Sequence, residues 1–138
     1  QLEKWQAAGL LETGKDLSGI RSLVNPLDTT RPLTERARAY LDVNCGHCHS
    51  QYGPASTSGL YYNAEETRPF HLGIWKSPVA AGMGGGGFKF DINPGHSRES
   101  IVTHRMNSIH PGVMMPEIGR VTIHREGVDL IARWIDSL

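Results

Sequence analysis

The sequence has no excess of charge of either sign. Its 14 Lys and Arg residues balance 14 Asp and Glu residues, so the formal net charge at pH 7 is zero. Nucleic acids and anionic membrane surfaces attract proteins through basic patches and a positive net field. The balanced charge therefore excludes both as expected partners.

Long apolar runs are also missing. No stretch approaches the roughly 18 apolar residues of a membrane span, and the chain does not open with a charged, apolar and small-residue signal peptide. It begins with Gln1 rather than Met. We expect no membrane insertion, and we interpret the chain as a processed protein or as a domain fused to further domains of a larger exported protein.

Apolar and aromatic residues are scarce, at 38% and 7% of the sequence, whereas Gly and Pro are frequent, at 16 and 8 residues. A chain of 138 residues is long enough for one domain and too short for two full cores. The glycine and proline content indicates long loops around a limited core of side chains. We expect something other than protein to help fill that core.

Cysteine is nearly absent, and the two cysteines of the chain lie in one segment, VNCGHCHSQ (residues 43–51). Neither is left over for a structural disulfide elsewhere. Residues 45–48 form a C-x-x-C motif, which is typical of dithiol oxidoreductases. His49 follows directly, however, and completes C-x-x-C-H, the attachment signature of c-type haem.

The residues before this motif favour the haem interpretation. A redox dithiol usually follows a buried strand and opens a helix, but Leu33, Ala37, Tyr40 and Leu41 recur at helical spacing. A helix that runs into the motif lets both cysteines reach one porphyrin edge while the histidine turns under the iron. A structural zinc site needs four ligands, usually in two spaced pairs, and no second cysteine pair exists. A thiol oxidoreductase and a metal site stay as alternatives.

A haem that carries electrons needs a second axial ligand, and a thioether sulfur raises its potential. Of the four methionines, Met83 lies in a glycine-rich run and Met106 in an expected helix, where an apolar side chain usually belongs to the core. Met114 and Met115 lie in HPGVMMPEIGR (residues 110–120), an irregular segment bracketed by Pro and Gly. Loops of this kind carry function more often than packing.

Taken together, NCGHCH (residues 44–49), MMPEIGR (114–120) and HREGVDLIARWIDSL (124–138) resemble class I c-type cytochromes. Within that class the chain is most similar to haem domains on the C-terminal side of larger exported bacterial proteins, which share blocks such as GPASTSGL (53–60) and DINPG (91–95). The resemblance covers residues 33–138. It implies a mainly α fold, class I cytochrome c-like, with helices around one covalent haem c, long loops and a short strand pair. Residues 1–32 are then a connector with a short helix.

The resemblance also implies site residues. Cys45 and Cys48 attach the haem, His49 is the proximal iron ligand, and Met115 is the distal ligand because it directly precedes Pro116. In the family the distal methionine is usually followed by two prolines, but here Glu117 takes the second place and Met114 precedes the ligand. Met114 therefore stays an alternative ligand.

Three further cofactor contacts and one turn are expected. In class I cytochromes a Gly-Pro step after the motif gives the proximal histidine a carbonyl acceptor, and Gly53-Pro54 stands in a similar place, although an ordinary turn is an equal interpretation. Haem propionates need Arg or amide partners where they are buried. Arg105 and Arg120 flank the methionine loop, and Trp75 carries an indole N–H. Each of these three residues has an exposed surface position as its alternative.

Secondary structure follows from the same spacing rules. We expect a helix from about residue 33 into the motif, a second from about 96 or 97 to 107, and a third over 124–138. The first should contact the last through Tyr40 or Leu41 and Trp134. Residues 88–92 predict a short strand, and residues 2–11 a short helix whose Trp5 and Leu10 either cover the domain or stay free. The run Gly84–Gly87 lacks the ending of a phosphate loop, so no nucleotide site is expected.

The function expected from these features is outer-sphere electron transfer by an iron that cycles between Fe(II) and Fe(III). Because haem attachment occurs outside the cytoplasm, the resemblance implies a bacterial periplasmic or secreted protein. Its partners would be transient redox proteins, such as an exported polysaccharide monooxygenase or a dehydrogenase. The alternative is a haem enzyme of peroxidase type, with an open distal position and acid–base residues such as His104 or His110.

Overall fold

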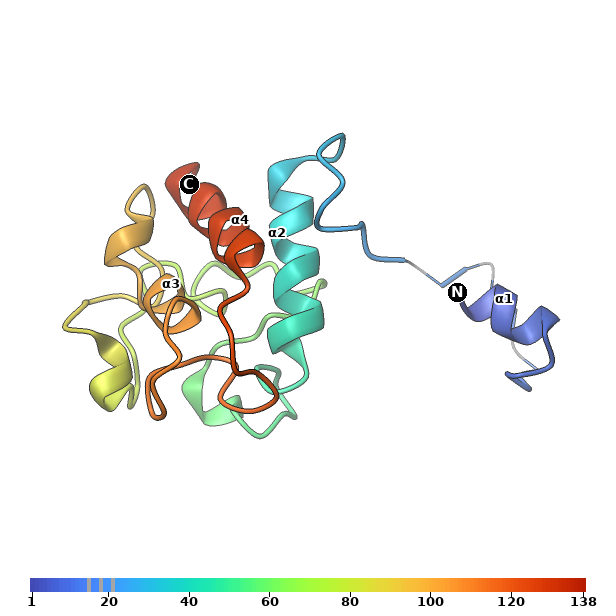
Figure 1. Cartoon of the computed structure of the whole chain (residues 1–138), viewed down its shortest axis with the longest axis horizontal. Coiled ribbons are helices and arrows are strands. Elements are labelled where there is room, and N and C mark those ends of the chain that lie inside the picture. Colours follow the sequence, from blue (N-terminus) through green and yellow to red (C-terminus); the bar gives the residue numbers. More distant parts are fainter. Residues whose placement is uncertain (15, 18, 21) are drawn as a thin grey trace.

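The computed structural model describes residues 1–14, 16, 17, 19, 20 and 22–138. Its helices are α1 (Leu2–Ala7), α2 (Leu33–Leu41), α3 (Ile101–Met106) and α4 (Arg125–Asp136). A π-helical turn spans Asp42–Gly46, and short 3-10 turns span Ser56–Ser58, Gly82–Gly85 and Ser97–Glu99. Long loops join these helices, and the described residues contain no named strand (Figure 1). The expected mainly α fold is confirmed.

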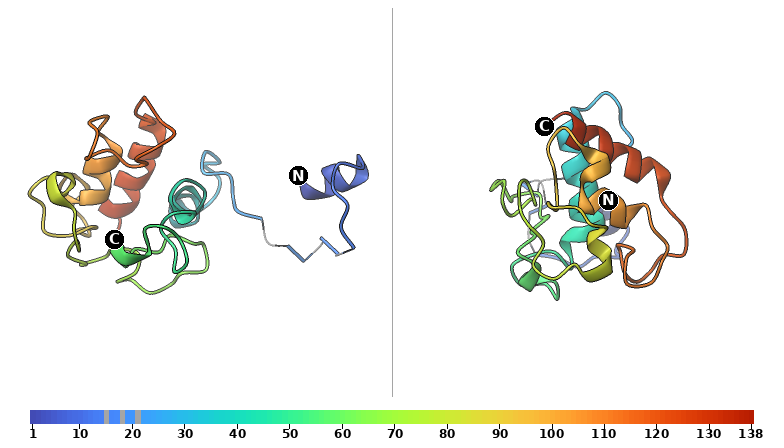
Figure 2. Two further views of the ribbon diagram at one scale, coloured as in Figure 1. Left: turned by 90° about the horizontal axis from the view of Figure 1, so that it is seen from below. Right: turned by 90° about the vertical axis from the view of Figure 1, so that its left-hand side faces the viewer.

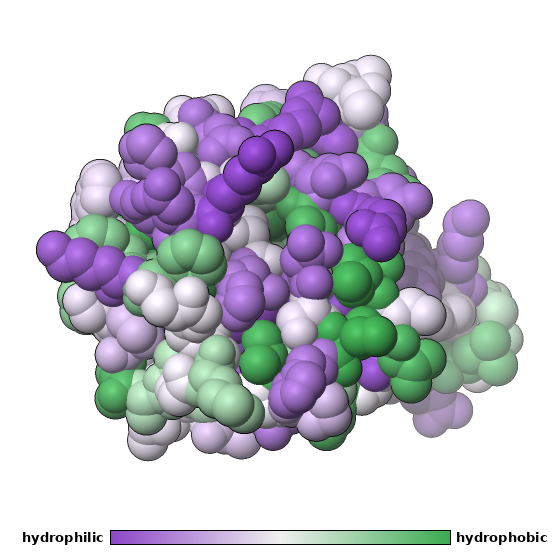
Figure 3. Space-filling model, turned by 60° about the vertical axis from the view of Figure 1, so that its left-hand side comes forward, coloured by the Kyte–Doolittle hydropathy of each residue, from purple (hydrophilic) through white to green (hydrophobic). Residues whose placement is uncertain are grey.

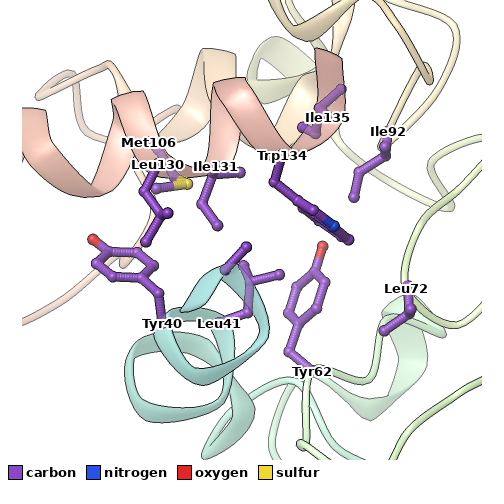
Figure 4. Packing of buried hydrophobic residues seen from close by; sticks show 11 residues of the cluster. Tyr40, Leu41, Tyr62, Leu72, Ile92, Met106, Leu130, Ile131, Trp134 and Ile135 are labelled. Carbon is purple, nitrogen blue, oxygen red and sulfur yellow. The ribbon is translucent and has the colours of Figure 1, made fainter. Parts of the chain in front are cut away.

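The core forms where α2 crosses α4, and the two helices lie side by side in both views of Figure 2. In α4 the buried residues Leu130, Ile131, Trp134 and Ile135 fall on one face, as an amphipathic helix requires. Figure 4 shows Leu41 of α2 pointing toward this face. The expected packing of the first domain helix on the last is therefore confirmed. The cluster comprises Ala37, Tyr40, Leu41, Tyr62, Leu72, Ile92, Met106, Leu130, Ile131, Trp134 and Ile135.

The helix expected over residues 96–107 is shorter and interrupted. Ser97–Glu99 form a 3-10 turn, Ser100 is extended (φ −104°, ψ 131°), and α3 begins only at Ile101. The break arises because Ser100 is fully buried and serves the neighbouring loop: its Oγ accepts the N–H of Asn93 at 2.8 Å. The carboxylate of Asp136, at the end of α4, accepts both the N–H and the Oγ–H of Ser97.

The strand expected at residues 88–92 is wrong. The segment forms only two isolated parallel bridges, Phe90 with Ser100 and Ile92 with Ile74. Pairing cannot extend along the second neighbour because Gly73 (φ 92°) and Trp75 (φ 54°) on either side of Ile74 turn the chain away from an extended course. Single bridges nevertheless hold three loop segments together beside the core.

The N-terminal segment stands apart from the rest (Figure 1). The helix expected over residues 2–11 is shorter, Leu2–Ala7, buries no residue and packs against no other element that the structure describes. Trp5 and Leu10 are exposed. No helix within the described part of the chain is long and apolar enough to cross a membrane.

Candidate functional site

The C-x-x-C-H motif begins in the π-helical turn Asp42–Gly46 that continues α2. Turns of this kind are rare and often lie at functional sites. The carbonyl of Cys45 accepts the N–H groups of Cys48 (3.1 Å) and His49 (2.8 Å), so the motif folds into a tight coil. Gly46 is buried, and the coil packs against the loop at Tyr62 and Asn63 there.

A second close approach fixes the chain after the motif. The N–H of Ala55 donates to the carbonyl of Cys48 at 3.1 Å. A Cβ on Gly53 would lie 2.3 Å from that same carbonyl oxygen, a distance that no side chain tolerates. The Gly53-Pro54 step is therefore required to bring the following turn, Ser56–Ser58, back over the motif.

That turn orients His49. Its Nδ1 lies 3.2 Å from the Oγ of Ser58, and the Ser58 hydroxyl itself donates to the carbonyl of Ala55 at 2.6 Å. A hydroxyl has one proton to donate, so Nδ1 of His49 carries the proton and Nε2 keeps the free lone pair. The acceptor is thus the Ser58 hydroxyl rather than a carbonyl of the Gly53-Pro54 step.

His49 is also held neutral. Burial, followed by the positive charge of Arg105, lowers the pKa of its imidazole. A neutral imidazole with a fixed tautomer is the form that ligates a metal. The sequence predicted the ligand but not Ser58, because only the fold shows which of several nearby hydroxyls faces the ring.

A cavity of about 330 Å³ brings most of the predicted site residues together. It is lined by residues of the motif, of the turn after it, of α3 and of the methionine loop. This size lies in the range of small-molecule and cofactor sites. The predicted residues among its lining are Cys45, Cys48, His49, Pro54, Arg105 and Met115, and its apolar wall includes Leu60, Tyr62, Ile101, Val102, Met106, Pro116 and Ile118.

The four methionines differ in whether they line this cavity. Met115 and Met106 line it, whereas Met114 and Met83 do not. Met106 is buried in the core cluster at the end of α3, as the sequence predicted. Met115 lies far from the motif along the sequence, yet it lines the same cavity as both cysteines and His49.

Two predicted propionate partners lie elsewhere. Trp75 is 55% exposed, packs edge-on against Phe90 and does not line the cavity. Arg120 lines an adjoining cavity of about 320 Å³, which shares Cys45 and Met115 with the first. Its guanidinium donates to main-chain carbonyls at the end of α3, including those of Arg105 (3.2 Å) and Met106 (2.9 Å).

The Cys45 thiol is not activated. Burial, reinforced by Cys48, raises its pKa to about 12, and both cysteines are free. Reactive dithiols instead have a first cysteine with a lowered pKa. At neutral pH Cys45 is therefore a protonated thiol, which does not suit thiol–disulfide exchange.

A buried acid also faces the cavity. Asp91 lines it and pairs with Lys76 at 3.1 Å, and both side chains are almost completely buried. Burial raises the pKa of the Asp91 carboxyl, and Lys76 opposes this shift. The pair could not be predicted from the sequence, because residues 76 and 91 are brought together only in the fold, where the Asp91 N–H also donates to the Lys76 carbonyl (2.7 Å).

Four buried side-chain polar atoms of the described residues have no hydrogen-bond partner, and each can donate a proton. Tyr62 lines the cavity itself, and Figure 4 shows its hydroxyl pointing toward Trp134. Arg120 lines the adjoining cavity. Unsatisfied buried donors are costly, and Arg38 and Trp134 line neither cavity. Within the described residues the atoms are Arg38 Nη1, Tyr62 Oη, Arg120 Nε and Trp134 Nε1.

No cluster of three or more His, Cys, Asp or Glu side chains that could hold a metal ion occurs in the described part of the chain. His104 and His110 do not line either cavity. Comparison of the chain with protein-family models, curated proteins and solved structures finds no match.

Proposed function

We propose that the chain is an exported electron-transfer domain that carries one covalent c-type haem on Cys45 and Cys48, with His49 and Met115 as axial ligands. The observation that carries this proposal is the shared cavity: both cysteines, the histidine and the predicted methionine line it, although Met115 comes from a distant loop. When bound, the haem supplies the one-electron Fe(II)/Fe(III) couple.

The residues present fit this group. The cavity wall is mainly apolar, which excludes water and raises the potential of an enclosed iron. The cation of Arg105, which lines the cavity, suits a group with carboxylate arms, since these would accept its protons. Ser58 holds Nδ1 of His49, leaving Nε2 as the ligating nitrogen.

The competing functions fit less well. A thiol oxidoreductase needs a nucleophilic first cysteine, and the pKa of Cys45 is raised to about 12. A haem peroxidase needs an open distal side with a histidine acid–base group, but Met115 occupies the cavity wall and neither His104 nor His110 reaches it.

The surface and the net charge bear on how redox partners would be bound. Figure 3 shows hydrophilic side chains gathered over the upper part of one face and hydrophobic side chains below them, and the formal net charge is zero. We propose transient redox proteins as partners, reached without strong electrostatic steering. An exported polysaccharide monooxygenase or a dehydrogenase would be partners of this kind, in the periplasm or outside the cell.

Expression with a secretion signal and a bacterial haem-attachment system tests the proposal. The wild-type chain should give a c-type haemochrome, with haem that stays on the protein in denaturant. Replacing both cysteines by Ser should abolish covalent attachment. A wild-type chain that stays colourless under these conditions would overturn the proposal.

The axial ligand has its own test. Met115→Ala should remove the Met-to-iron charge-transfer band and open the iron to imidazole or carbon monoxide. Met114→Ala is the matched control, because Met114 does not line the cavity, and it should keep the band. If Met114→Ala lost the band and Met115→Ala retained it, the assignment would be wrong by one residue.

A further inference from the structure

The loop that carries Met115 leaves α3 at Met106 and ends at Arg120, which returns to the end of the same helix. The last carbonyls of a helix have no partner within it, and a cation is stabilised there. Arg120 meets both needs: Nη1 donates to the Met106 carbonyl at 2.9 Å, and Nη2 donates to the carbonyls of Arg105 (3.2 Å) and Ser108. One guanidinium thus closes the loop.

The same helix end holds Met115 directly. The N–H of Met115 donates to the carbonyl of Arg105 at 3.1 Å, so this oxygen accepts from both Met115 and Arg120. The Arg105 side chain holds a second point of the loop, because its Nε donates to the carbonyl of Val113 at 2.9 Å. The loop is therefore fixed on both sides of Met114.

The glycine-rich run lies against the side chain of Arg105. A Cβ on Gly84 would lie 2.9 Å from Cζ of Arg105, so the absent side chain lets the 3-10 turn Gly82–Gly85 lie against the guanidinium. Burial lowers the pKa of Arg105, with Glu117 and Asp91 opposing. Within the run, Gly84 is the glycine that approaches this arginine.

We infer that Arg120, through its contacts with the carbonyls of Arg105, Met106 and Ser108, is a positioning residue that holds Met115 at the cofactor cavity. This inference rests on the proposed function for its haem readout and assigns Arg120 a role different from binding a propionate. A planar guanidinium serves three acceptors at once, which an ammonium cannot do in the same geometry.

The test compares Arg120→Gln and Arg120→Lys with Arg133→Gln, a control at an exposed arginine of α4. Loss of charged hydrogen bonds that hold the loop should strengthen imidazole binding to the ferric protein by about 10- to 100-fold in Arg120→Gln, because imidazole displaces Met115 more easily. Arg120→Lys should lie between Arg120→Gln and wild type, and Arg133→Gln should match wild type. Amide exchange of the Met115 N–H should accelerate in the same order.

The outcomes separate the inference from the proposed function. Unchanged imidazole affinity and unchanged Met115 exchange in Arg120→Gln, with the charge-transfer band present in wild type, would overturn the inference alone. A wild-type protein without haem overturns the proposed function, while Met115 exchange still tests the role of Arg120. If Arg120→Gln does not fold, Arg120→Lys carries the same comparison, and an affinity equal to wild type would sink the idea.

Discussion

At the residue scale, the site depends on side chains that orient the ligands as much as on the ligands themselves. Ser58 illustrates this: its single proton goes to Ala55, so it accepts from His49 and decides which imidazole nitrogen faces the cavity. A hydrogen bond accepted from the outer nitrogen raises the basicity of the ligating nitrogen. Under the proposed function, a haem iron bound by His49 should therefore respond to Ser58, a residue that does not touch it.

Ser58→Ala tests this dependence. Removing the acceptor makes His49 a weaker base, which stabilises Fe(III) less, so the midpoint potential should rise. A tenfold weaker preference for the ferric form corresponds to about 60 mV for a one-electron couple. Thr57→Ala, at an exposed neighbour in the same turn, should leave the potential unchanged. Redox titration of the three proteins decides, and an unaltered potential in Ser58→Ala would contradict the assigned tautomer.

A second residue-scale effect lies outside the cavity. Arg68 donates to the Glu66 carboxylate through Nε (2.8 Å) and Nη2 (2.6 Å), and these hydrogen bonds lower the pKa of Glu66 to about 2. The carboxyl of the unfolded chain titrates near its usual 4.5. Between these values the unfolded state binds the proton and the folded state does not, so stability is lost as the pH falls from about 4.5 to about 2.

Glu66→Gln should remove this part of the acid dependence. Its free energy of unfolding should be lower than wild type at neutral pH, by about 1 kcal/mol or less because Arg68 is largely exposed, and the gap should close near pH 2. Denaturant unfolding across this range measures it. Glu65→Gln, at the exposed neighbouring acid, serves as the control. A constant gap at all pH values would show that Glu66 acts through packing instead.

At the element scale, the crossing of α2 and α4 depends on one missing side chain. A Cβ on Gly127 would lie 2.1 Å from the hydroxyl oxygen of Tyr40 and 2.3 Å from its Cζ. The ring of Tyr40 therefore lies directly over the first turn of α4, where its hydroxyl is hydrogen bonded to Nδ1 of His124 at 3.0 Å. The glycine sets how closely the two helices approach.

Gly127→Ala should force Tyr40 or α4 to move and lower the free energy of unfolding by about 1–3 kcal/mol, the usual cost of overpacking a core. Asp129→Ala, at an exposed position of the same helix, should change it by about 0.5 kcal/mol at most. The Gly127→Ala/Tyr40→Val double variant should be more stable than the sum of the single effects implies, because the smaller side chain relieves the clash. Additive effects in denaturant unfolding would argue against this contact.

Periodicity predicted the elements whose faces are set by the core. The spacing of Ala37, Tyr40 and Leu41 gave α2, and the closing amphipathic stretch gave α4. It failed at Ser100, because a buried serine that hydrogen bonds to the preceding loop at Asn93 overrides helix propensity. The strand at residues 88–92 failed for a related reason, since two different segments each pair with it at one residue only.

The residues of the candidate site also divide into those that the sequence predicted and those that only the fold shows. Sequence spacing predicted Cys45, Cys48 and His49 as neighbours, and the Met-Pro step singled out Met115 over Met114, and all four line one cavity. It could not place Arg120, because a guanidinium is equally suited to carboxylates and to carbonyls, and the choice depends on where the loop returns. Residues that orient others are visible only in the folded chain.

At the scale of the whole molecule, little regular structure surrounds the cavity. Between α2 and α3 the described residues form only the π-helical turn, short 3-10 turns and two single bridges, and the loop residues Pro54, Ala55, Leu60, Tyr62 and Asp91 line the cavity. The cavity of about 330 Å³ lies between these loops, α3 and the methionine loop. Under the proposed function the haem is thus a large part of the core that composition alone makes too small.

Removing the haem should therefore greatly lower the stability of the fold. Without the haem, the apolar side chains that line the cavity of about 330 Å³ lose the group they would pack against, and the loops around it lose those contacts. The haem-free chain should keep helical far-ultraviolet circular dichroism from the α2–α4 pair but lose near-ultraviolet signal and cooperative unfolding.

Two preparations separate haem loss from the substitution itself: the Cys45→Ser/Cys48→Ser variant and the wild-type chain made without attachment machinery should behave alike. Cooperative melting of both at the temperature of the haem-loaded protein would show that the loops pack without a cofactor, and that the cavity is not part of a haem-dependent core.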